Sequence, residues 1–494
     1  MDAHRECPPY GMYLLTAALR EEGHDVIFVD LIAEGTNSIA SYLPELEDAD
    51  LVGIGATSMS WPTAVTLIEQ IRRVNLDLPI VLGGIHPTMF DKYILRAFPV
   101  EFIVRGEGEI AICRLVDALG GKISLSEVPN LSWKDDEGCV VRNTIKTLIP
   151  KEQLPEFPVP DYSSLPDNIY YALSIESSRG CAFDCSFCST SYRRTWRGMD
   201  SERFVDRLEE ILPFCDLTEG GVVHIIDDEF SMNVKRATEI ARIIDRRGIS
   251  PGLVFDSRAN DLLNEDYVEA IAPFTSQFLV GAECGYDDGL KLIGKGTTCE
   301  KLDKAASILK KFGIADRADF SFVLGLPWET REEIEKTILF ATGLHAKYGV
   351  RILLQWYCQI PGSKLWDEAH ANGIVTEAMY DEFGFFGNYY LFQSGVKIPA
   401  KEIYEISDKV SALLMLARAQ HPGKKMIEYA FPEAVAKYFP RLLESIEDNG
   451  LASLREVAGP GSKAAAQYRE PVKQSAAEPP VKVGIPLRHF EGLQ

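Results

Sequence analysis

The sequence is short of several features, and each shortage excludes a class of protein. It has no run of the ~20 apolar residues that a membrane-spanning helix requires, and its first residues lack the pattern of a secretory signal. Only ten of its 494 residues are cysteine, too few for a disulfide scaffold. Basic residues number 51 against 73 acidic ones, a net charge of −22 that argues against nucleic-acid and anionic-membrane partners. With 46% hydrophobic residues, the chain is predicted to be a cytoplasmic, multidomain globular protein.

The first part of the chain alternates short apolar runs with stretches of helical periodicity. This alternation is typical of a doubly wound, flavodoxin-like α/β domain, which we place at residues 1–125. A β-hairpin and a proline-rich linker are expected over 126–168. No apolar strand precedes Pro8, so we expect that the chain as given lacks the first strand of this domain. The expected strands are 25–30, 51–56, 79–84 and 101–106, and the expected helices lie near 12–22, 62–74, 88–97 and 108–119.

A second α/β series occupies residues 169–365. Six consecutive βα units favour a partial (β/α)6 barrel over an open sheet, and barrels carry their functional side chains at the carboxyl ends of the strands. Beyond the barrel we expect a helical C-terminal region over 366–457 and a disordered tail, rich in Ala, Pro and Lys, over 458–494. The expected barrel strands are 172–178, 222–227, 253–257, 277–283, 319–325 and 351–357, with helices near 201–213, 233–247, 299–312 and 330–345.

Three cysteines, Cys181, Cys185 and Cys188, lie within eight residues directly after the first predicted barrel strand. Thiolates at this spacing can point into one concavity, and three of them suit a 4Fe–4S cluster with one iron left open. A structural zinc site is the alternative, but it needs a fourth ligand. The nearby His224 lies inside a predicted strand without a partner, so we expect the iron–sulfur cluster.

The spacing Cys-x3-Cys-x2-Cys, with an aromatic residue before the third cysteine, resembles the radical S-adenosylmethionine (SAM) superfamily. The resemblance implies that the open iron binds SAM and that SAM cleavage yields a 5′-deoxyadenosyl radical, with a reductant such as flavodoxin or ferredoxin. Each acidic residue that ends a barrel strand also precedes a predicted helix, so helix N-capping is the alternative role for each one. The SAM contacts that the resemblance implies are Phe187, Asp228, Glu229, Arg258, Glu283, Gly325 and Pro327.

Motifs in the first domain resemble the cobalamin-binding domain that precedes many radical SAM barrels. They follow the predicted strands, where doubly wound sheets bind ligands, although Gly83-Gly84 alone would suit any flavodoxin-like domain. His4 stands in a partial match to the Asp-x-His-x-x-Gly loop that ligates cobalt, with Cys7 in place of Gly, and we do not expect it to bind cobalt. The cobalamin contacts that the resemblance implies are Tyr10, Gly11, Ser58, Gly83, Gly84, His86, Pro87, Gly106 and Glu107.

Together these resemblances imply an enzyme with a 4Fe–4S cluster, SAM and cobalamin as cofactors. The implied activity is methylation of an unactivated carbon, or of phosphorus, in a small molecule or peptide. A non-methylating enzyme, such as the oxidative ring cyclase of bacteriochlorophyll synthesis or a ring-contracting relative, is one alternative. A non-enzymatic cobalamin or iron–sulfur carrier or sensor is another. Cys7, Cys113 and Cys139 are scattered without pattern, which disfavours a methylthiotransferase, and no residue identifies the substrate or a catalytic acid or base.

Overall fold

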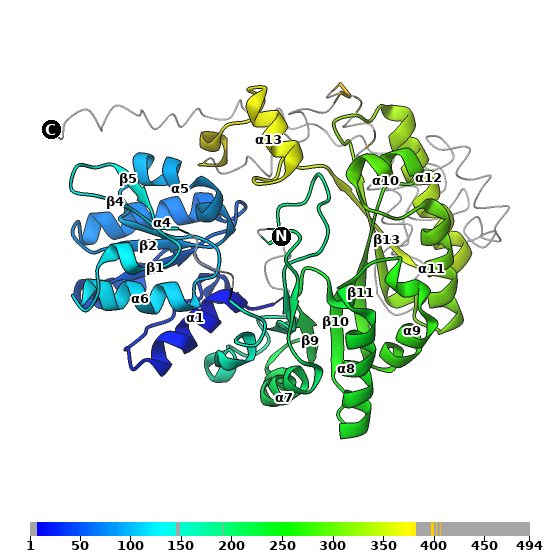
Figure 1. The fold of residues 1–494 in the computed structure, drawn as a ribbon, viewed down its shortest axis with the longest axis horizontal. Helices are drawn as coiled ribbons and strands as arrows, with labels where there is room; N and C mark the ends of the chain where they lie inside the picture. The colour runs from blue at the N-terminus through cyan, green and yellow to red at the C-terminus, as the bar shows by residue number, and fades with distance from the viewer. Residues whose placement is uncertain are drawn as a thin grey trace, which may run out of the picture. The chain divides into compact units, whose positions relative to one another are not determined.

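The computed structural model describes residues 7–144, 149–190, 192–381, 397–399, 402 and 406, all within one compact unit, Met1–Ser407. This unit contains two large β-sheets, one from each predicted α/β series (Figure 1). No helix among the described residues is both long and apolar enough to cross a membrane. The predicted tail and most of the predicted helical C-terminal region lie outside the described residues, as does His4.

The N-terminal sheet has five strands in the order β1-β2-β3-β4-β5. The first three pair in parallel, and the hairpin formed by the last two adds to them in antiparallel fashion. Three of the four strands predicted for this domain and the hairpin are therefore confirmed. The strands are β1 (Val52–Gly55), β2 (Ile80–Gly83), β3 (Phe102–Val104), β4 (Leu131–Lys134) and β5 (Val140–Arg142).

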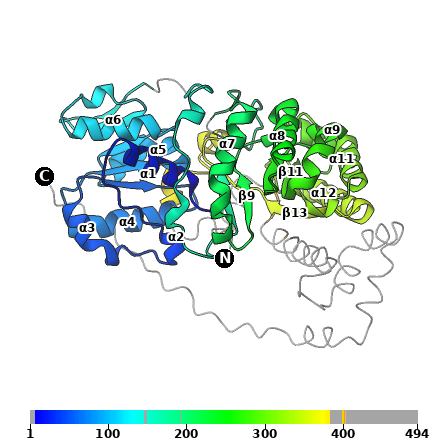
Figure 2. The ribbon, with the colours of Figure 1, turned by 90° about the horizontal axis from the view of Figure 1, so that it is seen from below.

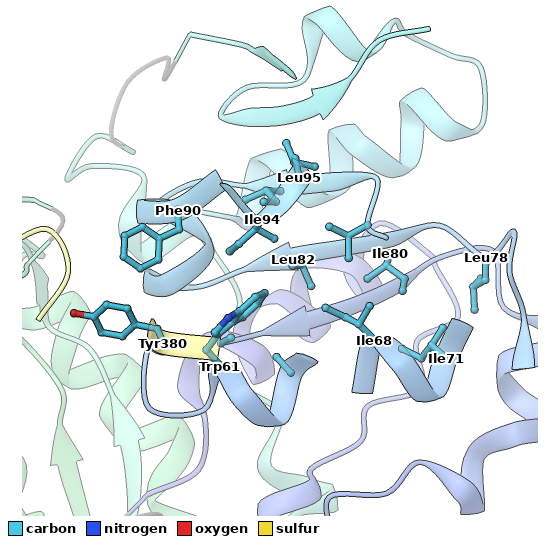
Figure 3. Packing of buried hydrophobic residues seen from close by; sticks show 14 of the residues in the cluster. Trp61, Ile68, Ile71, Leu78, Ile80, Leu82, Phe90, Ile94, Leu95 and Tyr380 are labelled. Atoms are coloured by element: carbon cyan, nitrogen blue, oxygen red, sulfur yellow. The ribbon is translucent and has the colours of Figure 1, made fainter. Parts of the chain in front are cut away.

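Helices cover both faces of this sheet, as expected of a doubly wound domain. Alternate side chains of β2 enter different cores: Ile80 and Leu82 pack with α4 and α5, whereas Val81 packs with α6. Figure 3 shows the first of these cores. The helices are α1 (Tyr10–Glu21), α2 (Leu31–Glu34), α3 (Leu43–Asp48), α4 (Trp61–Val74), α5 (Ile85–Ala97) and α6 (Glu109–Leu119).

The strand predicted over 25–30 is wrong, because this segment joins no sheet. Its Phe28 ring packs on α1 instead, with its centroid 4.5 Å from that of Tyr13, whereas Ile27 is exposed. Its last residue, Asp30, caps α2 by accepting hydrogen bonds from the amides of Ile32 and Ala33. An apolar pattern is satisfied equally by a strand and by an extended segment on a helix, which is why the sequence misled here.

The second sheet has six parallel strands in the order β13-β12-β11-β10-β9-β6. All six strands predicted for the barrel are confirmed, and their helices lie along the outer side of the sheet (Figures 1 and 2). The strands are β6 (Ala172–Ile175), β9 (Val222–Ile225), β10 (Gly252–Ser257), β11 (Thr275–Glu283), β12 (Ala318–Leu324) and β13 (Arg351–Trp356). The helices are α7 (Ser201–Ile211), α8 (Val234–Arg247), α9 (Glu265–Ile271), α10 (Asp287–Ile293), α11 (Cys299–Lys311) and α12 (Arg331–Tyr348).

Local signals explain where these helices begin and end. Asn233 caps α8 by accepting from the Arg236 amide, and Gly248 ends it in the left-handed conformation. Thr330 and Glu333 form a capping box at the start of α12.

After β13 the chain returns to the N-terminal domain. Helix α13 (Lys364–Ala371) and the 3₁₀ turn Glu377–Asp381 add Trp366 and Tyr380 to the core between α4 and α5 (Figure 3). The indole of Trp61 donates a hydrogen bond of 2.7 Å to the Asp381 carboxylate. The segment that follows the barrel thus packs into the apolar core of the N-terminal domain.

Candidate active site

The loop that carries Cys181, Cys185 and Cys188 lies between two short antiparallel strands, β7 (Ser178–Arg179) and β8 (Arg197–Gly198). Neighbouring parts of the barrel hold it through its backbone: Ser186 donates to the Ile293 carbonyl at 2.9 Å and accepts from the Leu365 amide at 3.1 Å. Gly180 begins the loop with a φ of +80°. A Cβ there would lie 2.8 Å from the Tyr192 carbonyl oxygen, so the close approach requires glycine.

The three thiols are free, and Cys185 is buried. Burial raises the pKa of Cys181 to about 11, and the carboxylates of Glu229 and Asp228 act in the same direction. Among the described residues, no group of three His, Cys, Asp or Glu side chains is arranged to hold a metal ion. Three cysteines from one loop match the ligand set of a 4Fe–4S cluster with one open iron, whereas a structural zinc site needs a fourth ligand.

Asp227 fixes the backbone just before this loop, a role that the sequence did not reveal. Its buried carboxylate accepts hydrogen bonds from the amide and hydroxyl groups of both Ser177 and Ser178, at 2.5 to 2.9 Å. It therefore ties the end of β9 to the end of β6, from which the cysteine loop starts. The only signal was two adjacent serines and an aspartate at the ends of neighbouring predicted strands.

Several predicted SAM contacts follow β9, β10 and β11, whose carboxyl ends share one edge of the sheet. Asp228 is exposed and accepts a hydrogen bond of 3.0 Å from the Thr190 hydroxyl, in the cysteine loop. The Arg258 guanidinium lies 3.3 Å from the centroid of the Phe183 ring, in the same loop. Two of the predicted residues therefore touch the cysteine loop directly.

The carboxylates of Glu229 and Glu283 already have partners. Glu283 forms a 2.7 Å ion pair with Lys295, whose carbonyl accepts a hydrogen bond from Arg258. Glu229 accepts from the amide and hydroxyl of Ser231 at the start of a 3₁₀ turn, which is the alternative N-capping role. Burial raises the pKa of Glu229 to about 8.

The loop after β12 carries Gly325 and Pro327, and Glu329 shapes it. The buried Glu329 carboxylate accepts hydrogen bonds from the amides of Gly325 and Leu326, at 2.7 and 2.9 Å, and from the Tyr286 hydroxyl at 2.9 Å. Burial raises its pKa to about 7. This role of Glu329 is not apparent from the sequence. Pro327 is half-buried in this loop, and Phe187 is half-buried in the cysteine loop.

Ser58, Gly83, Gly84 and Gly106 follow the three parallel strands of the N-terminal sheet and so lie at one edge. Gly84 has a φ of +91°, and a Cβ on it would lie 2.5 Å from the Ala56 carbonyl oxygen. Around Gly83 there is room, since a Cβ would have no neighbour closer than 3.9 Å. An edge with bare backbone and free space fits the passage of a nucleotide-like tail.

Other predicted cobalamin contacts lie inside the protein. His86 is fully buried, stacks on Trp61 at 4.7 Å between ring centroids, and lies 3.1 Å from the Ser58 hydroxyl through Nδ1. Burial lowers its pKa to about 3. Its Nε2 atom and the Tyr10 hydroxyl are buried without a hydrogen-bond partner, so each can still pair with a ligand or a water. Pro87 is buried beside His86, and Gly11 is exposed at the start of α1. The cobalamin contacts therefore stay a prediction.

Glu107, also predicted to contact cobalamin, belongs to a network of buried charges. It accepts hydrogen bonds from Arg197 at 2.8 Å and from Arg179 at 3.2 Å. Arg179 also pairs with Glu109 and Glu176, each at 2.5 Å. Burial alone would lower the pKa of Arg179, but Glu176 and Glu109 outweigh it and raise that pKa. Because Arg179 and Arg197 flank the cysteine loop, this network joins the loop to the N-terminal domain.

Comparison with known proteins gives matches in both halves of the chain. The family model for the B12 binding domain matches residues 2–116, and that for the radical SAM superfamily matches residues 175–341. The chain is similar to an uncharacterized methyltransferase of Pyrococcus horikoshii, with 35% identity over 383 residues that cover 74% of this chain and 80% of the relative. It is also similar to the anaerobic magnesium-protoporphyrin IX monomethyl ester cyclase of Rubrivivax gelatinosus, with 28% identity over 353 residues, 68% of this chain and 62% of the relative.

A solved structure shares this fold. It is the radical SAM methyltransferase TsrM of Kitasatospora setae with cobalamin and a [4Fe–4S] cluster bound. The TM-score is 0.62 at 20% sequence identity, and the match covers 76% of this chain and 74% of that one.

Proposed function

The chain belongs to the B12-binding radical SAM family, and on that premise we propose that it methylates an unactivated carbon, or phosphorus, of a small molecule or peptide. As a radical SAM enzyme of this family it uses a 4Fe–4S cluster, SAM and cobalamin. When bound, these groups supply a hydrogen-abstracting radical and a methyl carrier, while the protein positions them and excludes water. We place the reaction in the cytoplasm, where thiols stay reduced.

One observation carries this proposal: the edge of the N-terminal sheet that carries Gly83, Gly84 and Gly106 adjoins the cysteine loop. A Cβ on Gly106 would lie 2.9 Å from the Tyr192 hydroxyl oxygen, just beyond the third cysteine. The next residue, Glu107, pairs with Arg179, two residues before Cys181. Methyl transfer to a substrate radical needs the carrier and the radical source at one site, and this contact supports such a site.

The proposed ligand roles follow from these positions. Cys181, Cys185 and Cys188 would hold the cluster. Asp228 and Arg258, which contact the cysteine loop, would orient the amino and carboxylate ends of SAM through charge-assisted hydrogen bonds. Gly83, on which a Cβ would have no neighbour closer than 3.9 Å, would let cobalamin approach the backbone, and Gly84 would let the adjoining loop pack on Ala56.

The first test is cofactor content after anaerobic reconstitution. We expect about four irons and four sulfides per chain, as a 4Fe–4S cluster requires, and their loss in the variant that changes Cys181, Cys185 and Cys188 to alanine. Cys139→Ala is the matched control, because Cys139 is also free but exposed on the hairpin. Unchanged iron content in the triple variant would remove the basis of the proposal.

The second test is product mass, which separates methylation from the main alternative. The relative from Rubrivivax is named a cyclase, so an oxidative ring closure remains the second candidate activity. A product heavier by one methylene unit supports methylation, whereas a loss of hydrogen supports cyclisation. A carrier or sensor would produce no 5′-deoxyadenosine at all under reducing conditions.

A further inference from the structure

Three basic side chains gather around one carboxylate within the cysteine loop. Asp184 lies directly before Cys185, and the ammonium group of Lys364 lies 2.8 Å from its carboxylate. Arg193 lies 3.6 Å from the other carboxylate oxygen, and Arg194 donates a hydrogen bond to the same group. Three cations thus share one anion, which leaves an excess of positive charge. We call the cluster of Asp184, Arg193, Arg194 and Lys364 the loop patch.

The loop patch is accessible to a partner. The side chains of Arg194 and Lys364 are 72% and 48% exposed, and that of Arg193 is 20% exposed. Ala182 and Phe183, in the same loop, are exposed as well.

This positive excess contrasts with the rest of the chain, whose net charge is −22. Another exposed basic pair, Arg246 and Arg247 on α8, has the opposite balance. The four carboxylates that surround this pair outnumber it, and they belong to Glu202, Asp206, Glu209 and Glu239. An acidic protein approaching this chain is repelled by its overall field, so a local positive patch decides where such a partner can dock.

We propose that Arg193, Arg194 and Lys364 form the docking surface for a small acidic electron-transfer protein of the flavodoxin or ferredoxin class. This inference rests on the proposed function, because it assigns the partner that reduces the cluster held by the adjacent cysteines. The step is a single electron transfer: the donor protein is oxidised by one electron, the cluster is reduced by one, and no bond or proton moves. A donor bound here faces the residues between the first and second cysteine ligands.

The contacts of Lys364 show how close the patch is to the ligands. Its ammonium group also lies 3.4 Å from the Asp184 carbonyl oxygen, and the next residue, Leu365, donates to the Ser186 carbonyl. Asp184 and Ser186 are the two neighbours of Cys185. An electron from a donor bound at this surface can therefore reach the cluster through the cysteine loop without crossing the barrel.

The test compares two reductants on the reconstituted holoenzyme. Cluster reduction is followed by rapid-mixing absorbance, once with an acidic flavodoxin in its reduced state and once with reduced methyl viologen, a small cation that gains nothing from a cationic surface. For Arg194→Glu we expect the flavodoxin rate constant at low salt to fall about tenfold or more and to lose its dependence on ionic strength, since steering contributes roughly 10 to 1,000-fold. The methyl viologen rate should not fall. Arg246→Glu is the matched control and should change neither rate.

A direct binding measurement completes the test. The affinity of flavodoxin for the holoenzyme should weaken in Arg194→Glu, and should weaken less in Lys364→Gln, which removes one charge without reversing it. Unchanged flavodoxin rate and affinity in both variants would overturn the docking surface. Equal slowing with both reductants would also overturn it, because it would show that these cations only hold the loop. A wild-type protein that assembles no cluster would instead refute the proposed function.

Discussion

The buried arginine that joins the two halves of the active site makes a quantitative prediction. Arg179 is 10% exposed and forms ion pairs with Glu107, Glu109 and Glu176. In Arg179→Met, Glu107 keeps Arg197, but the ion-pair partner of Glu109 and Glu176 is lost. Removing one partner of a buried pair costs about 3–5 kcal/mol, because the remaining charge stays desolvated. We expect a loss of that size in the free energy of unfolding of the apoprotein, measured by urea denaturation.

A second arginine offers a matched control. Arg247 also pairs with three carboxylates, those of Glu202, Asp206 and Glu209, but these side chains are 38–55% exposed. Water and salt screen such pairs, so Arg247→Met should destabilise the protein far less. Replacing Glu109 by Gln in the Arg179→Met background should recover part of the loss, because it removes one stranded charge. Equal losses for the two arginines would refute the argument that burial, rather than the number of partners, sets the cost.

Two further changes test the two sheet edges. Gly84→Ala should destabilise the N-terminal domain by more than about 1 kcal/mol and weaken cobalamin binding, because the φ of Gly84 is positive and a Cβ there meets the Ala56 carbonyl. Thermal unfolding and a cobalamin titration check this prediction. As the control, Gly11→Ala in α1 should stabilise the protein by up to about 1 kcal/mol. Glu329 has a pKa raised by burial from 4.5 to about 7, so its protonated form stabilises the fold below about pH 4.5 and this contribution is lost as the pH rises through 7. Glu329→Gln should therefore flatten the dependence of Tm on pH between 5 and 8; an unchanged slope would contradict the assignment.

The barrel strands could be predicted because buried parallel strands form short runs rich in apolar residues. The run predicted at 253–257 and the observed β10 (Gly252–Ser257) differ by one residue. The segment 25–30 is also rich in apolar residues, yet it joins no sheet and none of its residues is buried. An apolar run in the sequence therefore does not reveal whether a neighbouring strand is present to pair with it.

In the candidate site, too, some features could be predicted from the sequence and others could not. The spacing of Cys181, Cys185 and Cys188 is local, so the sequence contains it in full. The partner of Glu107 is not local: the pairing with Arg179 links residues 72 positions apart and becomes visible only in three dimensions. Likewise, the ring that contacts Arg258 belongs to Phe183, whereas the sequence motif drew attention to Phe187. The sheet topology predicts which strand ends lie at the same edge, but the length and direction of each side chain determine which residues there are in contact.

The N-terminal domain is connected to the rest of the chain in two ways. In the first, Tyr380 packs into the core around Trp61, and the neighbouring Asp381 carboxylate accepts a hydrogen bond from the Trp61 indole. The guanidinium of Arg179 is a planar fork with fixed donor directions, and it meets carboxylates from both domains at once. The first connection therefore attaches the segment after the barrel, while Arg179 aligns the cysteine loop directly with the edge of the N-terminal sheet that carries Gly106. A methyl carrier and a radical source must meet one substrate atom within contact distance, so the proposed chemistry depends on this alignment.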